Sequence, residues 1–156
     1  MIYATCPLRV SLCGGGSDLP DISKKLKGNG CTIGFSSNLN MTVVGHTFIN
    51  KLILKYSEIE EVQELKDIKH SIYKEVLKRE DPLIKNYQIV SMCDVTGGTG
   101  LGSSSSFTVA LLALLYKKLK KKISTEKISM LAAIAEIEWC GNNIGLQDQF
   151  LGSLGG

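Results

Sequence analysis

A glycine-rich loop followed directly by four serines is the segment of this 156-residue sequence most suited to chemistry. The loop covers residues 96–102 (TGGTGLG), and the serines occupy 103–106. Glycines allow a backbone to turn tightly enough for successive amides to face one anion, and a helix start adds free amides and a positive dipole end. The hydroxyls add ligands for phosphate oxygens or magnesium. We therefore predict a phosphate-binding loop here, in preference to a glycine-rich turn with a serine cap.

Two common nucleotide motifs do not fit this loop. A classical P-loop requires Gly-x-x-x-x-Gly-Lys-Ser/Thr, and no lysine precedes the serines. The dinucleotide fingerprint requires a glycine spacing that the loop also lacks. The loop therefore indicates a phosphate site of another class.

Asp148 and Arg9 have ordinary structural interpretations when each is taken alone. Asp148 is typical of a helix-start cap, and Arg9, within an apolar strand, is typical of a buried ion-pair partner.

Composition narrows the class of protein. Hydrophobic residues make up 44% and charged residues 21%, which is ordinary for a globular domain. The net charge of +3 is too small to indicate a nucleic-acid partner, and much of it lies in the lysine run of residues 117–122, which is typical of a solvated helix end. No signal peptide or apolar run of membrane-spanning length is present, so we expect no membrane partner.

Cysteines and histidines give no metal pattern. The five cysteines are scattered, odd in number and without a Cys-x-x-Cys pair, which argues against a disulfide framework or zinc site and favours the reducing cytoplasm. His46 and His70 lack partner ligands in the sequence, so neither is a candidate metal ligand.

Several strands precede several helices along the chain, which predicts the α+β class. The expected strands are Ile2–Cys6, Arg9–Cys13, Cys31–Phe35, Asn40–Ile49, Lys51–Tyr56 and Tyr87–Val95. The expected helices are a short one after Pro20, then Ile59–Lys78, Ser103–Lys118 and Thr125–Trp139, the last capped by Ser124 or Thr125. The loop of residues 96–102 thus joins a strand to the most strongly patterned helix.

Three segments in the same order resemble the motifs of the GHMP kinases, the family of galactokinase, homoserine kinase and mevalonate kinase. The central segment is residues 100–106 (GLGSSSS), the first is residues 7–20 (PLRVSLCGGGSDLP), and the last is residues 145–150 (GLQDQF). The triple glycine with Ser-Asp-Leu-Pro, together with Gln-Asp-Gln, is most similar to the branch acting on D-glycero-D-manno-heptose 7-phosphate. The resemblance covers essentially the whole chain.

The resemblance implies the N-terminal ATP-binding domain of such a kinase, a mixed sheet with helices on one side, in a fold shared with a ribosomal protein domain. Asp148 and Arg9 would be catalytic, and Ser104, with Ser103 and Glu138 or Glu136, would bind Mg²⁺. The nucleotide site would consist of Gly98, Thr99, Gly100, Leu101, Gly102, Ser103, Ser104, Ser105 and Ser106. The sugar or sugar-phosphate site would include Gly15, Gly16, Ser17 and Asp18, although galactokinases carry Glu-His where this chain has Gly15-Gly16.

The family has a second half with a third glycine-rich motif, which this sequence does not contain. The resemblance therefore implies a truncated domain over residues 1–156, partnered by a separate C-terminal half or a second copy. We expect weak or no kinase activity from the chain alone. Robust turnover of heptose 7-phosphate in a coupled assay would contradict that expectation.

Three other functions stay open at this point. The chain could belong to a kinase for another sugar, such as fucose or galactose, or be an inactive fragment that keeps the nucleotide loop. It could also contact RNA, because the fold is shared with a ribosomal protein domain, but the lack of a basic stripe argues against this. Replacing Asp148 by Asn separates an enzyme, which would lose turnover, from a binder.

Overall fold

The computed structural model describes residues 1–155, which form a five-stranded mixed sheet in the order β1-β2-β5-β3-β4. The strands are β1 (Ile2–Cys13), β2 (Ile33–Thr47), β3 (Leu52–Lys55), β4 (Ile59–Val62) and β5 (Tyr87–Cys93). Neighbours are antiparallel except β3 and β5, which run parallel. The α+β class expected from the sequence is confirmed.

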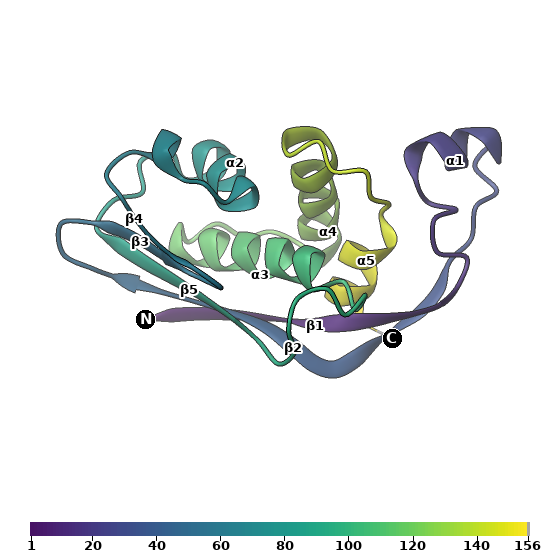
Figure 1. Ribbon diagram of the computed structural model, residues 1–156, viewed down its shortest axis with the longest axis horizontal. Helices are drawn as coiled ribbons and strands as arrows, with labels where there is room; N and C mark the ends of the chain where they lie inside the picture. The colour runs from purple at the N-terminus through teal and green to yellow at the C-terminus, as the bar shows by residue number, and fades with distance from the viewer. Residues whose placement is uncertain (156) are drawn as a thin grey trace.

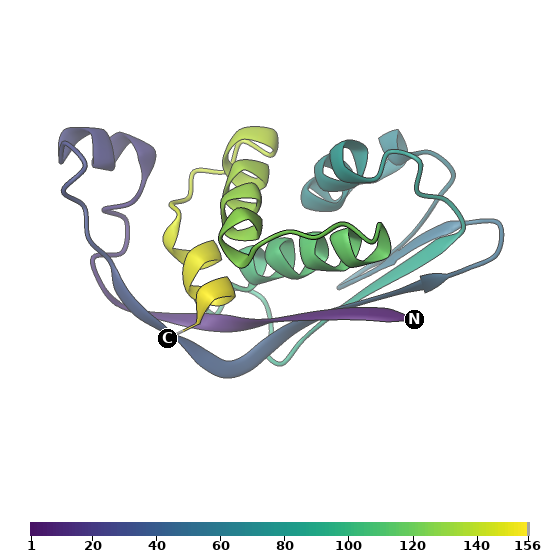
Figure 2. The same ribbon diagram turned by 180° about the vertical axis from the view of Figure 1, so that it is seen from behind.

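The α-helices lie on one face of this sheet, as expected (Figure 1). They are α1 (Pro20–Lys25), α2 (Ser71–Glu80), α3 (Ser103–Lys118), α4 (Thr125–Ile134) and α5 (Gln147–Leu154). A 3₁₀ turn, η1 (Leu65–Asp67), precedes α2, and a π-helical turn, η2 (Ala135–Trp139), continues α4. Figure 2 shows from behind that α1 stands apart at one end of the sheet, whereas α3 runs across its middle.

Strands β1 and β2 are longer than the apolar segments of the sequence suggested. The two strands expected on either side of Pro7 form the single strand β1. The two strands expected on either side of residues 36–39 likewise form the single strand β2. The pairing register of β1 with β2 shifts between Pro7 and Arg9. Such an irregularity accommodates the proline, which has no amide to donate, and the strand continues past it.

The helix expected over Ile59–Lys78 is wrong in its first half. Residues 59–62 form β4, which pairs with β3 and buries Glu60 and Val62 while Ile59 stays exposed. Pairing with β3 therefore determines the structure of this segment, although its two glutamates favour a helix. The later helix, Thr125–Trp139, is present as α4 with η2, and Ser124 caps it by accepting a hydrogen bond from the Lys127 amide.

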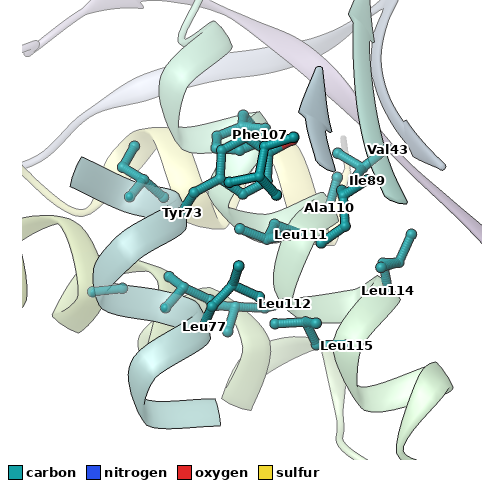
Figure 3. Packing of buried hydrophobic residues seen from close by; sticks show 14 of the residues in the cluster. Val43, Tyr73, Leu77, Ile89, Phe107, Ala110, Leu111, Leu112, Leu114 and Leu115 are labelled. Carbon is teal, nitrogen blue, oxygen red and sulfur yellow. The ribbon is translucent and has the colours of Figure 1, made fainter. Parts of the chain in front are cut away.

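The core forms where α3 crosses the sheet (Figure 3). Leu111, Leu112, Leu114 and Leu115 are fully buried where α3 packs against the sheet and the neighbouring helices. Tyr73 of α2 packs edge-on against Phe107 of α3, with ring centroids 4.8 Å apart. This packing fixes the N-terminal end of α3 relative to the strands, and so fixes the glycine-rich loop that leads into it. None of the described helices is long and apolar enough to cross a membrane.

Truncating the centre of α3 should destabilise the fold strongly. We expect Leu111→Ala to lower the free energy of unfolding by about 2–5 kcal/mol, because it leaves a cavity under the helix. Leu83, which is 83% exposed, provides the control, since Leu83→Ala should change it by less than about 0.5 kcal/mol. Urea unfolding followed by circular dichroism measures both, and equal effects would contradict the described core.

Candidate active site at the start of α3

The start of α3 leaves backbone amides available to an anion. Gly102 is the N-cap residue with φ of 71° and ψ of 26°, and no side chain caps the first turn. The first amides of a helix have no partner within the helix, and the dipole places partial positive charge there. The preceding residues 96–100 are exposed. The loop therefore presents uncapped donors at the surface.

Arg9 of β1 joins this loop to the other end of the chain. Its guanidinium makes a bidentate ion pair with Asp148, from Nε to Oδ1 at 2.6 Å and from Nη2 to Oδ2 at 2.7 Å. Its Nη1 donates to the Gly100 carbonyl at 2.5 Å, and its backbone amide donates to the Leu101 carbonyl at 3.1 Å. A carboxylate, a cation and the helix start thus meet at one place.

Gly102 makes this approach possible. A Cβ atom at Gly102 would lie 3.1 Å from Arg9 Cγ and 3.3 Å from Asp148 Oδ2, and the positive φ is itself unfavourable for a side chain. The Asp148 and Arg9 side chains remain 21% and 11% exposed, so a substrate can still reach the carboxylate. The structure therefore brings Asp148, Arg9 and residues 98–104 together.

Asp18 positions the helix that carries Asp148. Its Oδ2 accepts a hydrogen bond from the Gln147 amide at 2.9 Å, at the first residue of α5, and its Oδ1 accepts from the Gly16 amide at 3.2 Å. A carboxylate at a helix start also interacts favourably with the dipole. Asp18, expected to contact sugar hydroxyls, is thus engaged by backbone on both oxygens. Gly15 lies nearby, beside Ser11 and Gln147, whereas Ser17 bonds the Cys31 carbonyl.

Glu136, and not Glu138, faces the loop. Ser104 Oγ donates to Glu136 Oε2 at 3.1 Å, whereas Glu138 is exposed and its side chain makes no hydrogen bond within residues 1–155. Of the two glutamates expected as magnesium ligands, Glu136 and not Glu138 is the one in contact with Ser104. Helical spacing could have identified the alternative: Ser129, Ala132, Ala133 and Glu136 share the buried face at i, i+3, i+4 and i+7.

Glu136 is a buried acid in a polar network. It is 1% exposed, and Gln149 Nε2 donates to its Oε1 at 2.9 Å. Burial raises the pKa of Glu136, although hydrogen bonds from Gln149 and the neighbouring serines oppose this shift. A cation placed at Ser104 would favour the ionised carboxylate.

The four serines divide into two pairs. Ser103 and Ser104 retain exposure at the loop, whereas Ser105 and Ser106 are buried. Ser105 Oγ accepts from Gln149, and Ser106 Oγ donates to the Pro7 carbonyl at 2.9 Å. The hydroxyls of the second pair therefore hold α5 and β1 in place and do not reach the loop surface, contrary to the expectation that all four serve a nucleotide.

A cleft of about 420 Å³ opens beside the loop, and Gly97 and Ser104 are among the residues that line it. Its aromatic wall consists of Tyr56, His70 and Phe107, and burial lowers the pKa of His70, which favours a neutral ring. This wall could not be foreseen, because its members lie far apart in the sequence and only the fold brings them together. A larger cavity of about 650 Å³ lies at the opposite end of the sheet and is lined by none of the expected site residues.

Comparisons with known proteins agree on a family. Residues 66–156 match the family model of the N-terminal domain of GHMP kinases. A D-glycero-alpha-D-manno-heptose 7-phosphate kinase of Campylobacter jejuni is 29% identical over 166 residues, covering 99% of this chain and 49% of that protein. The chain thus spans about half the length of this relative.

Solved structures share the fold. A D-glycero-D-manno-heptose 1-phosphate kinase from Bacteroides thetaiotaomicron aligns with a TM-score of 0.87 at 22% identity, covering all of this chain and 54% of that one. Lactococcus lactis galactokinase, solved with galactose, aligns with a TM-score of 0.73 at 18% identity, covering 96% of this chain and 40% of that one. At these identities the likeness concerns the fold alone.

Replacing Glu136 by Gln should stabilise the chain in the absence of metal. The pKa of Glu136 is raised in the folded chain above its ordinary 4.5, so the folded state binds more protons and wild-type stability falls as pH rises from about 4.5 through the folded pKa. We expect Glu136→Gln to raise the free energy of unfolding by roughly 1 kcal/mol at pH 8, or Tm by about 2–4 °C. Thermal unfolding with EDTA between pH 4 and 8 tests this, and an advantage that shrinks with rising pH would contradict it.

Alanine at Gly102 should cost more than alanine at Gly98. Both glycines have positive φ, 71° and 82°, so each substitution carries backbone strain of about 1–2 kcal/mol. Only Gly102 would also press a Cβ against Arg9 and Asp148, since nothing lies within 4 Å at Gly98. We expect an extra loss of about 1 kcal/mol for Gly102→Ala by urea unfolding. Equal losses would mean that the close approach does not exist.

Proposed function

Because the chain belongs to the GHMP kinase family, we propose that it forms the nucleotide-binding half of an ATP-dependent kinase for a sugar phosphate. The function is similar to that of the heptose 7-phosphate kinase to which it is 29% identical. The observation that carries the proposal is the convergence of Asp148, Arg9 and the uncapped start of α3. Phosphoryl transfer requires these three elements: a carboxylate for the hydroxyl, a cation for the phosphate and donors for the leaving phosphates.

Asp148 would orient and deprotonate the attacking hydroxyl. Its two oxygens accept from Arg9, but a carboxylate has about four lone-pair sites, so capacity remains for a substrate hydroxyl. Arg9 would hold the carboxylate in place and share its positive charge with the phosphoryl group in transfer. Its third hydrogen bond, to the Gly100 carbonyl, keeps that charge against the loop.

The triphosphate would lie on residues 98–104, with the amides of the first turn of α3 as donors. The adjoining cleft is large enough for part of a nucleoside, and its wall of Tyr56, His70 and Phe107 offers apolar ring surface to a base. Glu60 supports this wall, accepting from the Tyr56 hydroxyl at 2.9 Å and the His70 amide at 3.1 Å. ATP is therefore the substrate that suits both the loop and the cleft.

The oxygen ligands near Ser104 fit Mg²⁺. Ser104 Oγ and Glu136 Oε2 are hard donors, and magnesium prefers a few protein oxygens together with substrate phosphates and water. Within residues 1–155 no cluster of three His, Cys, Asp or Glu side chains could hold a metal, which suits this mode better than a closed protein cage. The ion would supply charge neutralisation on the phosphates.

The second substrate would bind beside Gly15 and Gly16, near the end of β1. This region faces Gln147 and Ser11 and lies next to Asp148 along α5. The relatives are about twice as long, so a C-terminal half, or a second chain, would complete the sugar site. We propose D-glycero-D-manno-heptose 7-phosphate as the first substrate to test, followed by other sugars and sugar phosphates in a thermal-shift screen with Mg-ATP.

Asp148→Asn should abolish transfer and spare nucleotide binding. We expect turnover to fall by about 10²–10⁴-fold, because the variant lacks the general base, while ATP affinity stays near that of wild type. A coupled kinase assay measures turnover, on the chain completed by its second half if the chain alone is inactive. Isothermal titration measures affinity.

Asp67→Asn provides the matched control, since it removes an exposed carboxylate outside the site. It should leave both turnover and affinity unchanged. Full turnover in Asp148→Asn would exclude Asp148 as the base, and loss of ATP binding in that variant would assign it a structural role instead.

A further inference from the structure

Two neighbouring residues in the first turn of α5 face different parts of the site. Asp148 faces Arg9 and the glycine loop, whereas Gln149 points inward and is completely buried. Gln149 belongs to the Gln-Asp-Gln sequence but received no role from the sequence. A buried amide is costly unless its hydrogen bonds are made, so its partners indicate why it is present.

The side-chain amide nitrogen of Gln149 makes two hydrogen bonds, whereas its amide oxygen makes none. Its Nε2 donates to Glu136 Oε1 at 2.9 Å and to Ser105 Oγ at 3.0 Å. Its Oε1 is buried and has no hydrogen-bond partner within residues 1–155. The amide nitrogen thus serves Glu136 and Ser105, and the amide oxygen is left unpaired. The amide is therefore arranged around Glu136 at the expense of its own oxygen.

Glu136 is consequently held from two sides. Gln149 of α5 binds one carboxylate oxygen, and Ser104 at the start of α3 binds the other at 3.1 Å. With Oε1 fixed by Gln149, the carboxylate cannot turn freely, and Oε2 stays beside the Ser104 hydroxyl.

We infer that Gln149 is a positioning residue for magnesium, which fixes the Glu136 carboxylate with one oxygen turned toward Ser104 and the phosphate loop. The inference rests on the proposed function, because it assumes that Mg-ATP occupies this loop. Gln149 touches neither metal nor nucleotide; it acts through Glu136. Residues that orient metal ligands in this way typically change metal affinity by 10–100-fold when replaced.

The test compares Gln149→Leu with Ser153→Ala. Leucine preserves approximate volume and removes the amide together with its unpaired oxygen. Ser153 also lies on α5 and makes partly buried hydrogen bonds, to the Ser129 hydroxyl and to the backbone carbonyl of Gln149, but none to Glu136. Ser153→Ala therefore removes a hydrogen bond of α5, as Gln149→Leu does, but leaves the contacts of the Glu136 carboxylate in place. Isothermal titration gives the Kd for ATP with Mg²⁺ and with EDTA, and their ratio is the magnesium enhancement.

We expect Gln149→Leu to reduce the magnesium enhancement about tenfold or more, with the Kd in EDTA unchanged. Ser153→Ala should lower Tm and keep the wild-type enhancement. If Gln149→Leu does not fold, Gln149→Asn withdraws the same amide by one methylene and should show the same selective loss.

An enhancement in both Gln149 variants equal to that of wild type would overturn the inference and leave the proposed function intact. A Ser153→Ala enhancement reduced as far as that of the Gln149 variants would also overturn it, since any loosening of α5 would then suffice. If wild type itself binds ATP equally with and without Mg²⁺, the magnesium site fails and this inference fails with it.

Discussion

The bidentate ion pair between Arg9 and Asp148 is the interaction on which the rest of the site depends. It joins two residues 139 positions apart, and the same guanidinium reaches the Gly100 carbonyl, 91 positions away. Strand β1, the glycine loop and helix α5 are thereby held at one point (Figure 1). Arginine suits this task because its planar fork can satisfy a carboxylate and a carbonyl at once. The charges are only partly exposed, so their attraction is weakened less by solvent than that of a surface pair.

The apolar core stabilises the fold that holds the site together, whereas the polar network beneath the loop destabilises the fold. Leucines of α3 fix the helix on the sheet, so its first turn has a defined position. Behind that turn lie Glu136, with a pKa raised by burial, and Gln149, with an unpaired oxygen. Both features are costly for a folded chain without ligands. A cation and phosphates at the loop would offset that cost, which is the relation expected of a binding site organised before its ligand arrives.

The sequence predicted those parts of the fold and site whose information is local. The loop before Ser103, the helix that follows and the Ser124 cap depend on neighbouring residues, and all are present. Strand β4 was mistaken for helix because its pairing with β3, not its composition, determines its structure. The sequence left Glu136 and Glu138 both open, although the helical spacing of Glu136 with the small residues Ser129, Ala132 and Ala133 could have decided between them. The inward turn of Ser105 and Ser106 likewise depends on α5 and β1, which the sequence places far away.

We propose that the start of α3 and its glycine loop form the phosphate site of a kinase half-domain. Backbone amide shifts of the ¹⁵N-labelled chain, recorded during titration with Mg-ATP, test this most directly. We expect the largest shifts in residues 98–104, with smaller ones at Arg9 and along the cleft wall. Shifts confined to the large cavity at the opposite end of the sheet, or no shifts at all, would contradict it.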